Sequence, residues 1–273
     1  MSALFFGHYC YGVGTNVSAI VLEVLNGRLH PKCINQTYVT VIPKVKAPQS
    51  PKDFRPISLE NVIYKLVSKV LVDCLKEVLP PVIHESQIAF FLAWMIINTA
   101  ITAFEHFYHM KKKRQNEGND NMCLKLDMSK VYHRVEWDHL EKVMLRMGFD
   151  GSWVNLVMNC ISSVSYSILV TRQPMEFFSP LRGLHQRDPL SPYLFPMCTE
   201  GLSALIIDLA ARGELHGTRA SKSALVVTHL FFADDSLLFL STNQENEQQV
   251  FDVLRVTKLT SRQVVNVEIE GPL

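Results

Sequence analysis

The sequence predicts an α+β fold in which part of the sheet is antiparallel. Helix-type and strand-type hydrophobic patterns follow one another irregularly rather than in strict alternation, which favours α+β over α/β architecture. Residues 229–240 read as two apolar strands joined by a turn, the pattern of an antiparallel hairpin. With 48% hydrophobic and 19% charged residues, the composition excludes disordered and collagen-like proteins.

Apolar residues at intervals of three and four predict five helices. The clearest pattern covers 63–79 and ends at Pro80, because proline cannot continue a helix. A shorter pattern over 17–25 follows Thr15, which we expect to cap that helix. The other three patterns lie over 137–147, 153–161 and 202–209.

Strands are predicted over 122–128 and 165–170, and carboxylates lie near the end of the first and at the hairpin turn. Asp127 lies near the end of 122–128, and Asp234 and Asp235 form the hairpin tip. Acidic residues are common in turns, so an ordinary turn is the alternative interpretation. If the strands are neighbours, the three carboxylates converge on one point. Such a cluster repels itself and is usually neutralised by divalent cations with oxygen ligands.

An uncharged stretch over 86–104 has nearly the length of a membrane helix. Polar residues such as Gln87 and Asn98 interrupt it, so we expect a buried core helix and no contact with a membrane. The basic run 111–114 follows. It could hold a nucleic-acid backbone or serve as a nuclear address, but its polar surroundings favour a solvated loop.

Charge is balanced overall but uneven along the chain. The net charge of +1 gives no general attraction to polyanions. Residues 43–76 carry seven basic against three acidic residues, and 231–273 carry three against seven. This asymmetry suggests that one face of the protein binds a polyanion, although charged helix faces exposed to solvent explain it equally well. The six cysteines form no C-x-x-C pair, so we expect no disulfide partner and an intracellular setting.

Five segments resemble, in order, the motifs of the reverse transcriptase domain of LINE-type (non-LTR) retrotransposons, the plant form in particular. They are the opening ALFFGHYCYGVGTNVSAIVLEVLNG, the fingers segment TVIPKVKAPQSPKDFRPISLENVIYKLVSKVL, LKLDMSKVYHRVEW (motif A), RGLHQRDPLSPYLF (motif B) and HLFFADDSLLFL (motif C).

This resemblance implies a right-hand polymerase with fingers and a palm, the palm being an antiparallel ferredoxin-like sheet with packed helices. The implied divisions are an N-terminal helical segment over 1–36, fingers over 37–121 and palm over 122–273. No thumb is expected after residue 273, and no endonuclease domain before the fingers. The implied activity is RNA-directed DNA synthesis on an RNA template from a DNA primer and dNTPs, with a nuclear location.

The resemblance also implies roles for single residues. Asp127, Asp234 and Asp235 are the catalytic carboxylates that bind two Mg²⁺ ions, for which Mn²⁺ is a possible substitute. Two such ions stabilise the attacking and leaving oxygens of phosphoryl transfer. Tyr132 is the aromatic gate that excludes ribonucleotides; the alternative is a core aromatic at a helix start.

Three further residues are implied to bind substrate. Lys44 and Arg55 neutralise the incoming triphosphate, for which the guanidinium fork of arginine is well suited. Without the resemblance, both would be interpreted as solvated surface charges. Gln186 belongs to the nucleotide pocket.

Several positions depart from the family pattern and support a second hypothesis. Arg187 stands where the family has glycine, and His133 where it has aspartate. Leu92-Ala93-Trp94 replaces a Pro-Gly-Arg sequence, and 261–269 lacks a glycine and a lysine. A glycine allows close approach of backbone to nucleotide, which a large side chain at Arg187 would hinder. The alternative is therefore a truncated, degenerate and catalytically inactive copy that at most binds nucleic acid.

Overall fold

The computed structural model contains two four-stranded sheets, built from different parts of the chain. It describes residues 3–261 and 266–270 except 85, 88–92, 118–120, 128–130, 172, 186, 222–223, 233–234 and 243. The chain divides into two units: residues 1–75 with 141–191, and residues 76–140 with 192–273. The predicted division at 36 and 121 stays a prediction.

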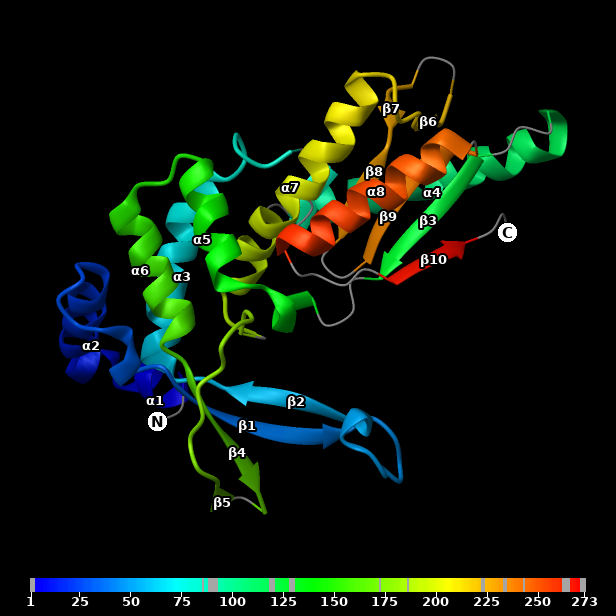
Figure 1. The fold of residues 1–273 in the computed structure, drawn as a ribbon. Coiled ribbons are helices and arrows are strands. Elements are labelled where there is room, and N and C mark those ends of the chain that lie inside the picture. The colour runs from blue at the N-terminus through cyan, green and yellow to red at the C-terminus, as the bar shows by residue number, and fades with distance from the viewer. Residues whose placement is uncertain are drawn as a thin grey trace. The chain divides into compact units, whose positions relative to one another are not determined.

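The first unit holds a mixed sheet in the order β2-β1-β4-β5. The middle strands β1 and β4 are parallel, and each pairs antiparallel with its outer neighbour. Figure 1 shows β1 and β2 as a long hairpin. The strands are β1 (Gln36–Pro43), β2 (Phe54–Leu59), β4 (Ser165–Val170) and β5 (Gln173–Pro174).

Helices supply the core of the first unit. The apolar faces of α2, α3 and α6 are buried, and residues such as Val24, Val67 and Val157 are fully enclosed. The helices are α1 (Ala3–His8), α2 (Cys10–Leu25), α3 (Val62–Val78) and α6 (Gly151–Ser162), while α5 (Trp137–Arg146) spans the division at residue 140.

The second unit holds an antiparallel sheet in the order β10-β3-β9-β8. Its strands are β3 (Asn121–Asp127), β8 (His229–Phe232), β9 (Asp235–Ser241) and β10 (Asn266–Glu270), and a short pair is formed by β6 (Thr218–Arg219) and β7 (Val226–Val227). Its helices are α4 (Ala93–Glu117), α7 (Ser191–Ala211) and α8 (Gln244–Ser261). The predicted α+β class with an antiparallel sheet is confirmed.

Helices cover both faces of this sheet. Cys123 and Phe239 are register partners on one face and pack with Ala103 of α4. Side chains alternate between faces along a strand, so Leu238 belongs to the other face, where it lines a small apolar space together with residues of α7 and α8. In Figure 1, α8 and α4 flank these strands. This enclosure fixes the strands that carry the carboxylates.

Hydrophobic spacing located the long elements and missed some ends. The helix predicted over 17–25 begins at Cys10, so Thr15 is inside it and the expected cap is wrong. The chain is already helical from Ala3 to His8, which makes a start at Thr15 unnecessary. The run 111–114 belongs to α4 rather than to a loop. Lysine and arginine are good helix formers and can extend a helix into solvent.

The uncharged stretch 86–104 leads into α4, and its residues 88–92 fall outside the described part of the chain. Farther along α4, Ala103 and His106 are buried whereas Ile101 and Phe104 are exposed, so this helix has one buried face. Within the described residues, one helix, α7, has the length and composition to cross a membrane, and 56% of its apolar window is buried inside the protein. Burial of this kind is typical of a core helix.

Candidate active site

The last residue of β3 and the first residue of β9 face each other. Asp127 is the register partner of Asp235, while on its other side Asp127 pairs with Asn266 of β10. Leu126 of β3 and Leu238 and Phe239 of β9 are buried, which fixes this register because a slip by one residue would move each side chain to the other face. The sheet thus brings together two of the three predicted carboxylate residues, which are 108 positions apart in sequence by the difference of 235 and 127.

This arrangement suits a divalent cation chemically. Residues directly opposite in an antiparallel pair belong to the same face of a sheet, and like charges there are destabilising. Carboxylates are the hard oxygen ligands that Mg²⁺ prefers. The third predicted residue, Asp234, lies outside the described residues, and among the residues that are described no group of three metal-type side chains is assembled. The pairing of Asp127 with Asp235 is therefore the feature of this structure that fits a divalent cation.

Tyr132 lies shortly after β3, in a short 3₁₀ helix over Val131–Arg134. It is half-buried, and its ring centroid is 5.3 Å from that of Phe195 in α7. Aromatic pairs at this separation stabilise a fold by about 0.5–1.5 kcal/mol beyond their buried area. Tyr132 thus has a packing role, and its role as a gate stays a prediction.

Lys44 and Arg55 lie on the exposed hairpin of β1 and β2. The ammonium of Lys44 donates to the Lys52 carbonyl at 2.9 Å, and Arg55 is the register partner of Ile42. The loop between them is well organised: the Asp53 carboxylate accepts from the backbone N–H groups of Gln49 and Ser50, which lowers its pKa. The hairpin holds both cations at one end, in the first unit.

Gln186 is outside the described residues, but the residues on both sides of it are anchored. His185 contacts Glu60, and both side chains are buried. The His185 ring also stacks on Tyr166, with centroids 5.2 Å apart and planes 6° apart. Lys65 lies 3.6 Å from the Glu60 carboxylate. These contacts join the start of motif B to the end of β2.

Asp188 supplies the second anchor of motif B. It accepts from the Tyr64 hydroxyl at 3.2 Å and from the Leu190 backbone N–H at 3.1 Å. Burial raises the pKa of Asp188, and nearby Glu60 raises it further. Burial likewise raises the pKa of Tyr64. The first unit therefore encloses two acidic side chains: Asp188 of motif B and Glu60, which contacts motif B through His185.

Between these anchors the backbone adopts a conformation that favours glycine. Arg187 has φ 74°, in the left-handed region that costs a non-glycine residue roughly 1–2 kcal/mol. The side chain is exposed. Position 187, where the sequence resemblance implies a glycine, thus has a backbone conformation that glycine adopts without strain.

Sequence reasoning missed Glu60, His185 and Asp188. The partners Glu60 and His185 are separated by 125 positions, and Tyr64 and Asp188 by 124. No local pattern signals such pairs. A charged residue in an otherwise apolar segment, such as Glu60 just before the 63–79 pattern, is the one available indication, because buried charges require partners.

A second polar cluster supports β8, the strand that leads to the carboxylate turn. His229 Nε2 lies 2.7 Å from the Ser203 hydroxyl and 2.8 Å from that of Ser86. Its Nδ1 lies 2.9 Å from the Thr228 hydroxyl. Burial, together with nearby His84, lowers the pKa of His229 to about 3. His229 is thus a neutral, hydrogen-bonded core residue.

Residues 42–268 match the family model described as reverse transcriptase (RNA-dependent DNA polymerase). The chain belongs to the reverse transcriptase family. The match includes all seven predicted site residues, from Lys44 to Asp235.

Curated relatives of this reverse transcriptase domain come from mobile elements and from a plant. The Pol polyprotein of the R2 element of Drosophila melanogaster is 25% identical over 93% of the chain, and that of Popillia japonica is 25% identical over 80%. An uncharacterised mitochondrial protein of Arabidopsis thaliana is 46% identical over 25% of this chain and 56% of its own length. The chain spans 24% and 29% of the two R2 proteins. The resemblance to non-LTR retrotransposons is confirmed.

Solved structures with the same fold include telomerases. Telomerase from Candida albicans, in complex with a fragment of telomeric RNA, matches with TM-score 0.58 and 14% identity, covering 87% of this chain and 43% of that one. Apo telomerase from Candida tropicalis matches with TM-score 0.57 and 12% identity, over 87% and 45%. The α+β structure is thus that of polymerase fingers and palm.

Proposed function

We propose that this reverse transcriptase domain is an RNA-directed DNA polymerase, which adds nucleotides from dNTPs to a primer 3′-OH on an RNA template. The observation that carries the proposal is the register of Asp127 with Asp235 at adjoining strand ends. Family membership supplies the reaction class.

In this mechanism, Asp127, Asp234 and Asp235 would hold the divalent ions. Such ions, when bound, stabilise the charge on the attacking and leaving oxygens of phosphoryl transfer. Lys44 and Arg55 bind and neutralise the triphosphate from the exposed hairpin, with Arg55 able to donate two parallel hydrogen bonds. Tyr132, packed on Phe195, orients its ring toward the sugar and excludes a 2′-hydroxyl. Gln186 positions the nucleotide, between the anchored residues His185 and Asp188.

The test is Mg²⁺-dependent incorporation of dTTP on poly(rA) primed with oligo(dT). The wild-type chain is compared with Asp127→Asn and Asp235→Asn, and with Glu247→Gln, an exposed acid on α8, as the matched control. We expect both Asp variants to lose incorporation. The Glu247→Gln control should incorporate dTTP as the wild type does. Equal incorporation by wild type and Asp235→Asn contradicts the proposal.

A second candidate is nucleic-acid binding without catalysis. The exposed cations of the β1–β2 hairpin favour it, because Lys44, Lys46, Lys52 and Arg55 all reach solvent. Phosphate contacts by such residues need no catalytic site and weaken linearly with the logarithm of salt concentration. Arg187, in place of glycine, also favours this candidate.

Binding of a fluorescent single-stranded RNA over a range of salt separates the two. Salt-sensitive binding that persists in Asp127→Asn and weakens in Lys44→Gln/Arg55→Gln, with no incorporation by any variant including Arg187→Gly, supports binding alone. Incorporation by Arg187→Gly but not by the wild type instead assigns the defect to motif B.

A further inference from the structure

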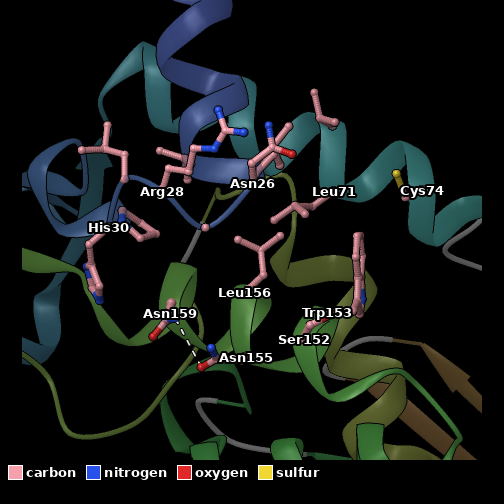
Figure 2. Close-up of a pocket in the computed structure, with 16 residues that line it drawn as sticks. Asn26, Arg28, His30, Leu71, Cys74, Ser152, Trp153, Asn155, Leu156 and Asn159 are labelled. Carbon is pink, nitrogen blue, oxygen red and sulfur yellow. Dashed lines mark hydrogen bonds between the residues drawn. The ribbon is translucent and has the colours of Figure 1, made fainter.

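A cavity of about 650 Å³ in the first unit lies apart from all predicted site residues. It is formed by the end of α2 and the loop after it, by α3 and by α6 (Figure 2). Small-molecule sites in proteins have volumes of about 300–1,000 Å³, so this cavity has the size of a binding site.

The apolar surface that the cavity offers to a ligand comes mainly from α6. Leu156 and Trp153 line the cavity and are half-buried, whereas Leu71 behind them is almost fully buried. Trp153 closes the side near Cys74. A flat or branched apolar group placed between these residues would lose its water contacts and gain about 25 cal/mol per Å² of buried surface.

The polar groups around the cavity are mainly hydrogen-bond donors or neutral amides. They include Arg28, Ser152, Asn155 and Asn159, and no carboxylate lines the cavity. An anionic group of a ligand would therefore meet no like charge among the described residues of the cavity wall.

Arg28 is available to a ligand although it already has a partner. Its Nη1 lies 3.1 Å from the Glu23 carboxylate, with both side chains largely exposed. Exposed ion pairs contribute about 0–1 kcal/mol. The guanidinium has five N–H donors, so it can bind a second carboxylate while keeping Glu23 or can exchange one for the other.

We propose that this cavity binds a small aromatic carboxylic acid. The ring packs against Leu156 and the indole of Trp153, and the ligand carboxylate accepts hydrogen bonds from Arg28. The site is independent of the proposed polymerase chemistry, since no predicted catalytic or substrate-binding residue lines it.

Cys74 provides a direct test because it is an exposed free thiol on the cavity wall. Cys10 and Cys33 are also exposed free thiols but do not line the cavity, so they are internal controls. The probe is dithiobis-nitrobenzoate, an aromatic disulfide with a carboxylate on each ring. A cysteine thiolate attacks one sulfur, forms a mixed disulfide and releases one thionitrobenzoate, so the exchange is balanced in atoms and electrons.

Labelling of each cysteine is followed by acid quenching and peptide mass analysis. We expect the rate at Cys74 to saturate with probe concentration and to exceed the rates at Cys10 and Cys33 about tenfold, the factor that about 1.4 kcal/mol of binding provides. Uncharged dithiodipyridine should show a smaller preference, and free nitrobenzoate should slow labelling at Cys74 only.

Variants assign the effect to the cavity. Arg28→Gln and Leu156→Ala should each remove most of the preference for Cys74, whereas Arg219→Gln, an exposed arginine in the second unit, should leave it unchanged. Calorimetric titration of Cys74→Ser with nitrobenzoate should still detect reversible binding. A rate at Cys74 that rises linearly with probe and equals that at Cys10 or Cys33 overturns the proposal.

Discussion

Asp127 and Asp235 are direct partners across β3 and β9, although each ends or begins its strand in a different sequence motif. Two acidic residues at facing positions repel each other without a counter-ion. The packed helices on both faces of the sheet hold them there. Acidic residues that are held together at a cost in stability are typical of functional sites.

Divalent metal should relieve that repulsion. We expect Mg²⁺ to raise the melting temperature of the wild type by a few degrees, since 100-fold excess over Kd contributes about 2.7 kcal/mol. In EDTA, Asp127→Asn should be about 0.2–1 kcal/mol more stable than wild type and should gain nothing from Mg²⁺. Thermal melts with and without Mg²⁺ measure both effects. An equal Mg²⁺ response in Asp127→Asn would place the ions elsewhere.

Arg187→Gly should stabilise the protein. Arginine at φ 74° occupies a conformation that glycine adopts freely, so the substitution removes strain of about 1 kcal/mol. Urea denaturation is the measurement. Arg182→Gly, an exposed arginine five residues earlier with no positive φ, should be neutral or destabilising. A loss of stability in Arg187→Gly equal to that of Arg182→Gly would show that position 187 is not strained.

Removing one partner of the Glu60–His185 contact should destabilise the protein far more than removing both. His185→Leu removes the buried contact of Glu60, although Lys65 still lies 3.6 Å from its carboxylate, and should cost about 3–5 kcal/mol. The double variant Glu60→Leu/His185→Leu replaces the pair by apolar groups and should be within about 1 kcal/mol of wild type. A double-mutant cycle in urea gives the coupling. Additive losses would mean that the two side chains do not depend on each other.

Acid should destabilise the protein partly through His229. Its pKa falls from 6.5 to about 3 on folding because the side chain is buried. The folded state therefore binds the proton less readily than the unfolded state. The stabilisation is complete above pH 6.5 and is lost as the pH falls toward 3. Between pH 7 and pH 4 the loss from this residue is roughly 2–3 kcal/mol.

His229→Asn removes the titrating group, while its amide can still hydrogen-bond to Ser203. Its stability should decline less between pH 7 and pH 4 than that of the wild type, as followed by urea midpoints at each pH. The exposed His216 in the same unit provides the control substitution His216→Asn, which should keep the wild-type slope. A wild-type slope in His229→Asn as well would assign the acid sensitivity to other groups.

Hydrophobic spacing by itself determined the long elements. The 63–79 pattern became α3 (Val62–Val78), and the 165–170 pattern became β4 with the same bounds. The α3 pattern succeeds because one buried face imposes a regular period on the residues. In β4 the bounds agree although Ser167 is the buried side chain and Ile168 and Val170 are exposed. Element starts were harder: Thr15 has the chemistry of a cap but lies inside α2, since propensity at one position is easily outweighed by the helix around it.

The sequence also predicts which residues carry the chemistry, because Asp127, Asp234 and Asp235 lie in motifs whose order identifies the family; those catalytic roles stay predictions. The tertiary structure supplied the partners of Asp127 and of other residues that the sequence could not pair. Three features join segments that are far apart in the chain: the pairing of Asp127 with Asp235, the contact of Glu60 with His185, and the cavity beside Trp153. Such contacts follow from how helices and strands pack on one another, and packing joins residues whose spacing in sequence has no regular pattern.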